Sequence, residues 1–280
     1  MDASQERVFH YHAAANALGG VLTHPYKAVI STEANSALAN AGGYNASKTV
    51  PYHLDHVLHC DRAYTHVTGG EEDGYWSTLT SAVVEGVNLL EIVTADKIVG
   101  QISSKHPKKG NHPIVSFVGS QFVNLRINGQ LIEPVLDVHP LPGKPVPPAK
   151  GKSSSSPDPQ VSSYHHPDVR KLAAAQSRKA TGHKHAPDWV KRRYGWLESV
   201  GDINDRGHLL CTLVREIKGS DPDYTYGQVI HVPGFGNIFL AEVSCDAKSY
   251  HLTMLRAEMG CASCGTVSMS APSTNGRPYP

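Results

Sequence analysis

The sequence predicts an all-β protein, most simply a β-sandwich, with a short helical insertion. Two stretches, Thr80–Ser103 and Ile114–Val138, are dense in β-branched residues, as strands are. The chain of 280 residues also contains 25 Gly and 19 Pro, which suits many short strands joined by turns. A third observation is that a second strand-like block follows near the C-terminus, after a region of different composition. We therefore expect strands from both blocks to pack together as one split domain.

The first block spans residues 26–139 and follows a segment, residues 1–25, that we expect to be loose. Its best-specified strand has Val123, Leu125 and Ile127 alternating with polar residues, which indicates one buried face. Asn128-Gly129 then supplies the positive φ angles of a type I′ hairpin turn. The expected strands of this block are Lys27–Ser31, Lys48–His59, Ala63–Val67, Trp76–Glu85, Asn88–Val93, Lys97–Ser103, Ile114–Val118, Phe122–Ile127 and Leu131–Val138.

The middle of the chain interrupts the strand pattern. Residues 140–165 are rich in Pro, Lys and Ser, so we expect an extended, mobile linker. Residues 166–205 form a basic insertion with two helix starts, Pro167-Asp168 and Pro187-Asp188, where proline and an acid suit the first turn. The second block, residues 206–280, predicts strands at His208–Glu216, Gln228–Val232, Asn237–Cys245, Tyr250–Met259 and Thr266–Ser270.

Charge and hydropathy exclude some classes of protein. The net charge of +1 gives no overall case for nucleic-acid or membrane binding. No apolar run approaches the roughly 18 residues of a transmembrane helix, and the first residues do not resemble a secretory signal. The chain as written therefore predicts a cytoplasmic protein.

Four segments resemble a known family. VNLLEIVTADKIVGQIS and SFVGSQFVNLRINGQLIEP in the first block, with HVPGFGNIFLAEV and SYHLTMLRAEM in the second, resemble the choice-of-anchor P type β domain of bacterial surface proteins and its uncharacterised relatives. The resemblance implies an all-β domain at the cell surface or outside the cell, with protein partners or self-association. It carries no catalytic residues, and from the residues as written we expect neither the signal peptide nor the anchoring tail of such proteins.

A histidine-rich stretch is the first candidate site. If Lys48–His59 is one strand, His53, Asp55 and His59 project from the same face. Two imidazoles and a carboxylate could bind zinc with a fourth ligand from a neighbouring strand. The alternative is that these residues form the solvated face of an edge strand, since some clustering is expected among 17 histidines. In that case we expect no cofactor.

The basic insertion is the second candidate. Its cations could neutralise phosphates or an acidic partner, and its tryptophans could stack on bases. Alternatively, it is a solvated helical face whose tryptophans pack on the sheet. The residues are Arg170, Lys171, Arg178, Lys179, Lys191, Arg192 and Arg193, with Trp189 and Trp196.

The five cysteines give no closed disulfide framework. Cys211 and Cys245 lie in strand-like runs and are expected to be buried and reduced. Cys261 and Cys264 form a lone CxxC, for which we expect a local disulfide or unpaired thiols rather than a metal site.

No spacing of acids and histidines specifies acid–base catalysis. The leading functional hypothesis is accordingly a non-catalytic structural or binding β protein that acts through protein contacts. A metal-binding protein or metal-dependent enzyme around Asp55, and a nucleic-acid or acidic-partner binder using the basic insertion, are the alternatives.

Overall fold

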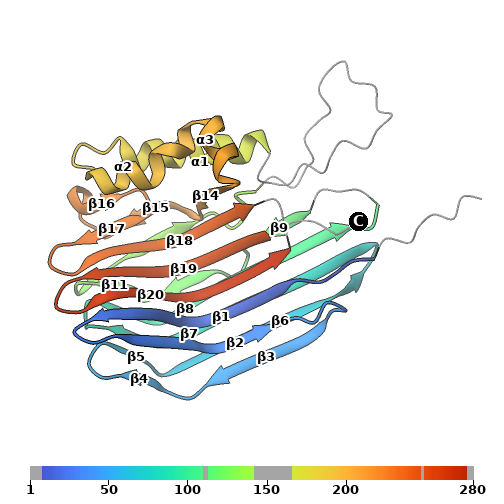
Figure 1. Ribbon diagram of the computed structural model, residues 1–280, viewed down its shortest axis with the longest axis horizontal. Helices are drawn as coiled ribbons and strands as arrows, with labels where there is room; N and C mark the ends of the chain where they lie inside the picture. Colours follow the sequence, from blue (N-terminus) through green and yellow to red (C-terminus); the bar gives the residue numbers. More distant parts are fainter. Residues whose placement is uncertain (1–7, 110–112, 142–165, 247–248, 276–280) are drawn as a thin grey trace, which may run out of the picture.

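The fold consists of two stacked β-sheets with short helices along one side (Figure 1). The computed structural model describes residues 8–109, 113–141, 166–246 and 249–275. The predicted all-β sandwich with a helical insertion is confirmed. In the described part of the chain, no helix is long and apolar enough to cross a membrane.

The first sheet joins the two ends of the chain. It has eight strands in the order β16-β17-β18-β19-β20-β1-β2, and β14 pairs with β18 beside β17. Their bounds are β1 Ala13–His24, β2 Ala28–Ala37, β14 His208–Thr212, β16 Thr225–Tyr226, β17 Val229–Val232, β18 Gly236–Asp246, β19 Ser249–Gly260 and β20 Cys264–Asn275.

The expectation of a loose segment over residues 1–25 is wrong for residues 13–24, which form β1 between β20 and the edge strand β2 of this sheet. Its first half is rich in alanine, a residue of low strand propensity, so the sequence pattern is weak there. Ala13, Ala15 and Ala17 are nevertheless buried. Small side chains let the two sheets approach one another at this strand.

The second sheet is built from the first block. Strands β12-β11-β8-β7-β5-β4 form its main path, with β9 and β10 beside β8, β6 beside β7, and β3 beside β6. Strands β13 (Glu133–Leu136) and β15 (Val214–Lys218) form a separate two-stranded ribbon. The ten bounds are β3 Gly43–Thr49, β4 Tyr52–Leu54, β5 Leu58–Cys60, β6 Arg62–Glu72, β7 Tyr75–Leu89, β8 Val93–Pro107, β9 Ile114–Ser116, β10 Gln121–Val123, β11 Arg126–Ile127 and β12 Gln130–Leu131.

Several predicted strand boundaries differ. His208–Glu216 divides into β14 and β15, and Leu131–Val138 divides into β12 and β13. Trp76–Glu85 and the start of Asn88–Val93 merge into β7, because Gly86 at φ 64° lets the strand continue through an irregularity. Lys48–His59 instead divides between the end of β3, β4, a turn and the start of β5. Phe122–Ile127 is divided at Asn124, which has φ 50°.

The Asn-Gly turn is confirmed. Asn128 and Gly129 have φ angles of 51° and 79°, and Ile127 pairs with Gln130 across the hairpin. Both residues adopt the left-handed conformation that a type I′ turn requires.

The sheets meet closely where β8 crosses β20. A Cβ atom on Gly100 would lie 2.7 Å from Ser270 Oγ and 2.9 Å from Met254 Cγ, so only glycine fits there. Ser270 Oγ also donates to the carbonyl of Ala82 on β7 at 2.7 Å. A buried polar contact therefore joins the two layers.

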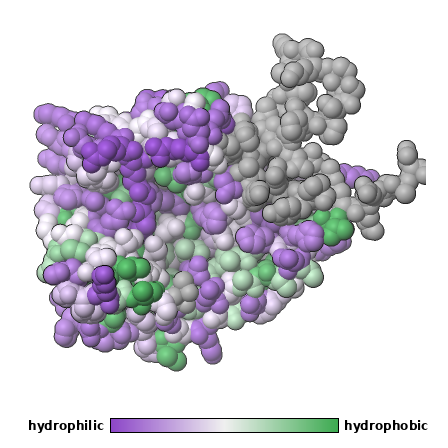
Figure 2. All heavy atoms as spheres, in the orientation of Figure 1, coloured by the Kyte–Doolittle hydropathy of each residue, from purple (hydrophilic) through white to green (hydrophobic). Residues whose placement is uncertain are grey.

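Three α-helices form the insertion: α1 (Pro167–Thr181), α2 (Asp188–Tyr194) and α3 (Val200–Arg206). The two predicted helix starts are confirmed within one residue. Two short 3-10 helices, η2 (Gly195–Glu198) and η3 (Pro222–Tyr224), accompany them. In Figure 1 the α-helices lie along the β14 and β16 end of the sandwich, and in Figure 2 this helical layer is mainly hydrophilic at its surface. The predicted linker falls largely on residues 142–165, outside the described residues.

Candidate functional site

The outer face of the second sheet carries an open groove of about 540 Å³ over β3 and β6. Strand β6 turns Ala63, Thr65 and Val67 into the core. Tyr64 and His66 therefore point outward, since side chains alternate along a strand. The full lining is Tyr44, Ala46, Ser47, Lys48, Arg62, Tyr64, Thr65 and His66.

Strand pairing places three rings of the groove in a row. Lys48 lies opposite Tyr64, Ala46 opposite His66, and Tyr44 opposite Thr68. The two tyrosines are therefore offset by four positions along the strand direction. At about 3.3 Å per residue, this offset is roughly 13 Å. His66 lies between them beside the small Ala46, and Tyr44 is 71% exposed. The row is an accessible aromatic platform.

The groove has a positive side. No carboxylate lines it among the described residues, and Lys48 makes no ion pair in that part of the chain. At one end, Glu85 accepts a hydrogen bond from Arg62 Nε at 2.8 Å and lies 3.0 Å from Lys97 Nζ. Burial opposes ionisation of Glu85, but these partners outweigh burial and lower its pKa. One carboxylate is therefore shared by two cations, which leaves the face positively charged.

The sequence reasoning missed this groove. Tyr44 and Tyr64 are 20 residues apart, and only the pairing of β3 with β6 brings them together. The available signal was the alternation of Arg62, Tyr64 and His66 with buried residues along one strand. That alternation identifies the outward face of β6 but not the strand that pairs with it.

The predicted zinc residues lie on a hairpin rather than on one strand. His53 is on β4 and His59 on β5, directly opposite one another, with ring centroids 5.9 Å apart. Asp55 lies in the intervening turn at φ 44°, and its carboxylate accepts a hydrogen bond from Tyr26. The expectation that all three share one face of a single strand is wrong, because the chain reverses at the turn. In the described residues, no three ligating side chains already converge on a metal position.

The basic insertion is divided between solvent and the sheet. Its exposed cations are Lys171, Arg178, Lys179, Lys184, Lys191 and Arg192, whereas Arg170 and Arg193 are half-buried. Residues 166–198 contain eight Lys or Arg and three Asp or Glu, a net charge of +5.

The two tryptophans of the insertion are partly buried. Trp189 packs edge-on against Tyr226 and Phe239. The indole of Trp196 donates to the carbonyl of Arg193 at 2.7 Å and lies under the guanidinium of Arg206. Both rings are thus engaged within the fold, which leaves the exposed cations as the part of this surface open to a partner.

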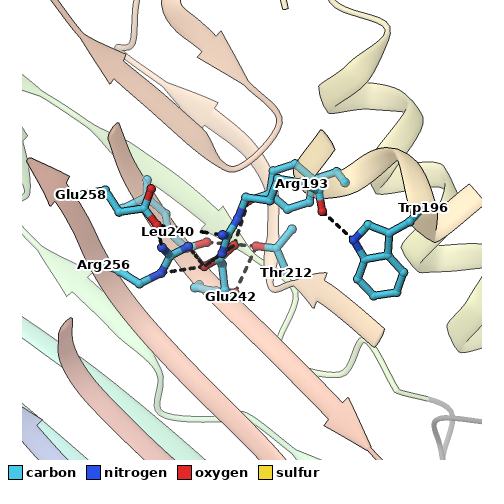
Figure 3. Close-up of polar contacts among 9 residues, drawn as sticks. Arg193, Trp196, Thr212, Leu240, Glu242, Arg256 and Glu258 are labelled. Atoms are coloured by element: carbon cyan, nitrogen blue, oxygen red, sulfur yellow. Dashed lines mark hydrogen bonds and ion pairs between the residues drawn. The ribbon is translucent and has the colours of Figure 1, made fainter. Parts of the chain in front are cut away.

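A buried ionic cluster fastens α2 to the first sheet (Figure 3). Glu242 on β18 is 8% exposed. Its carboxylate accepts hydrogen bonds from Arg256 Nη2 at 2.5 Å, Tyr194 Oη at 2.8 Å and Arg193 Nη2 at 3.4 Å. Burial acts to raise the pKa of Glu242, but the two arginines outweigh it and hold the pKa low. Glu258 pairs with Arg256 at the rim. The cluster balances its own charges, so we assign it a structural role.

The cysteines are free thiols. Cys211 and Cys245 are buried on the paired strands β14 and β18, as expected. Cys261 and Cys264 lie at the tip of the β19–β20 hairpin, where each thiol donates to a backbone carbonyl.

A comparison with known protein families assigns the chain to one family. Residues 9–246 match the model of the domain of unknown function DUF8256. The chain belongs to this family. No curated protein and no solved structure gives a significant match.

The DUF8256 match covers the groove, the histidine hairpin and the helical insertion, but it ends where β18 ends. Strands β19 and β20 lie beyond it, yet they join β18 to β1 in the first sheet. The folded unit of this DUF8256 protein therefore extends to at least residue 275.

Proposed function

We propose that this protein is a non-catalytic binding module that holds an extended acidic segment of a partner protein in the groove over β3 and β6. The outward-facing row of exposed Tyr44 and half-buried His66 and Tyr64, flanked by Lys48 and Arg62, carries the proposal. Tyrosine and arginine dominate the energetics of protein interfaces because they combine apolar area with polar groups. The resemblance to the choice-of-anchor β domain of surface proteins supports the same non-catalytic role.

The charge of the surface favours a protein ligand over a nucleic acid. Nucleic-acid-binding domains are usually strongly basic, with pI above about 9. This chain has a pI near 7.8, and one of its groove cations shares a carboxylate with Lys97. A surface of this kind suits a ligand with a few carboxylates and aromatic or aliphatic side chains.

The test uses a fluorescein-labelled octaglutamate peptide, with binding followed by fluorescence anisotropy. We expect saturable binding that weakens as NaCl rises from 50 to 500 mM, because salt screens exposed charges. Tyr44→Ala and Lys48→Glu should each raise the Kd roughly tenfold or more, which corresponds to about 1.4 kcal/mol or more. Both side chains are exposed, so neither change should affect folding.

The controls place the same substitutions elsewhere. Tyr224→Ala, near the end of η3, and Lys191→Glu, on α2, should leave the Kd unchanged. Binding that is insensitive to both groove substitutions would contradict the proposal. Loss of binding through Lys191→Glu alone would move the site to the helical insertion. Tighter binding of an eight-nucleotide oligothymidylate than of the peptide would replace the protein ligand by a single-stranded nucleic acid.

A further inference from the structure

The β4–β5 hairpin places two imidazoles in position to share one metal ion. His53 and His59 form a directly opposed cross-strand pair, and Asn88 on β7 lies next to His59 in the same cross-strand row. Two nitrogens bound to one zinc ion at about 2.0–2.1 Å each must lie within about 4 Å of one another. The ring centroids of His53 and His59 are 5.9 Å apart. Because both rings are at the surface, side-chain rotation can bring one nitrogen of each ring within about 4 Å of the other.

A small hollow of about 170 Å³ lies beside this pair. It is lined by three imidazoles and two carboxylates, together with Asn88 and Leu58. The five ionisable residues are His53, Asp55, His56, His59 and Glu91. The hollow therefore brings together more potential ligands than the two opposed histidines.

The turns that form this hollow are held in an unusual backbone conformation. Asp55, Leu90 and Glu91 have φ angles of 44°, 53° and 59°, and positive φ angles are uncommon for residues other than glycine. Leu90 N donates to Val57 O at 2.9 Å, and Glu91 N donates to the Asn88 side chain at 2.8 Å. These bonds hold the β7–β8 turn, and with it Glu91, against the histidine hairpin.

A third carboxylate, that of Asp61, is placed to orient one of the imidazoles. His59 Nε2 lies 3.0 Å from Asp61 Oδ1, which leaves Nδ1 as the ligating nitrogen. Metal-bound histidines commonly donate their other ring N–H to a carboxylate, which fixes the tautomer. Asp55, by contrast, already accepts a hydrogen bond from Tyr26, so we give it a supporting role.

We propose that this hairpin binds one divalent transition-metal ion, with His53 and His59 as anchoring ligands and with His56 and Glu91 as further donors from the same hollow. Imidazole donors select ions such as Zn²⁺, Ni²⁺ and Cu²⁺ over Mg²⁺ and Ca²⁺, and Cu²⁺ binds most tightly in that series. The site is independent of the β3–β6 groove, so the two proposals can fail separately.

The experiment is a calorimetric titration of the tag-free protein with ZnCl₂ and with CuSO₄ in a non-chelating buffer. One equivalent of either ion should bind at a dominant site. His53→Ala and His59→Ala should each weaken that binding at least tenfold. Both changes are at the surface, and unchanged circular dichroism spectra would show that the variants remain folded.

The chain offers a matched control pair. His183 and His185 have ring centroids 6.0 Å apart but belong to the α1–α2 loop, outside this hollow. His185→Ala should leave the stoichiometry and affinity unchanged. An equal loss in His185→Ala, no change in His53→Ala and His59→Ala, or MgCl₂ binding as tightly as ZnCl₂ would each overturn the proposal.

Discussion

Glu242→Ala is expected to lower the free energy of unfolding by about 3–5 kcal/mol, the usual cost of removing one partner from a buried ion pair. The reason is that the partly buried Arg256 and Arg193 would lose their buried carboxylate and keep only Glu258 at the rim. Tyr194, which is also buried, would lose the acceptor of its hydroxyl. Chemical denaturation at neutral pH, followed by circular dichroism, measures the loss.

Two further variants separate the causes of this effect. Glu242→Gln keeps the shape and an acceptor for Tyr194 but removes the charge, so it should fall between wild type and Glu242→Ala. Glu258→Gln removes the other carboxylate of the cluster, whose side chain is 38% exposed, and should cost less than about 1 kcal/mol. A loss below 1 kcal/mol for Glu242→Ala would mean that the cluster does not hold α2 on the sheet.

Acid should destabilise the protein through His106, which is fully buried at the end of β8. Its ring lies beside Phe9 in an aromatic cluster that includes Tyr11 and Trp76. Burial lowers the pKa of His106 to about 4, and a backbone contact with Asn275 offsets this only in part. Neither ring nitrogen makes a hydrogen bond of standard geometry among the described residues.

The direction of the pH effect follows from proton uptake. The unfolded chain binds a proton near pH 6.5, whereas folded His106 resists protonation until about pH 4. The contribution of His106 to the free energy of unfolding is therefore complete above pH 6.5. It decreases as the pH falls and reaches its lowest value below about pH 4. A shift of about 2.5 units corresponds to a loss of about 3 kcal/mol.

His106→Leu provides the comparison, because leucine fills an apolar site and cannot be protonated. Urea titrations of both proteins at pH 7 and pH 4.5 should show a loss on acidification that is smaller in the variant by about 2.5 kcal/mol. Other groups, including His251, titrate in both proteins and cancel in this difference. Equal acid sensitivity of the two proteins would show that His106 does not control it.

The sequence predicted most of the local structure because local signals carry it. Asn128-Gly129 specifies its turn through backbone conformation, and proline followed by an acid starts α1 and α2 where expected. The histidine hairpin was harder to predict. Pattern alone continued Lys48–His59 as one strand, whereas the chain reverses after Leu54. The two histidines came together across that turn, by a route different from the predicted one.

Composition and periodicity by themselves determined that this chain is an all-β protein with a helical insertion, since strand alternation and turn chemistry act over a few residues. Only the tertiary structure decided which surfaces and charges meet. Tyr44 reaches Tyr64 through the pairing of β3 with β6, and Arg193 reaches Glu242 across 48 intervening residues. It also placed the alanine-rich β1 between β20 and β2, where its small side chains are buried by close packing of the two sheets. Such contacts depend on packing between distant segments, and no window of neighbouring residues contains them.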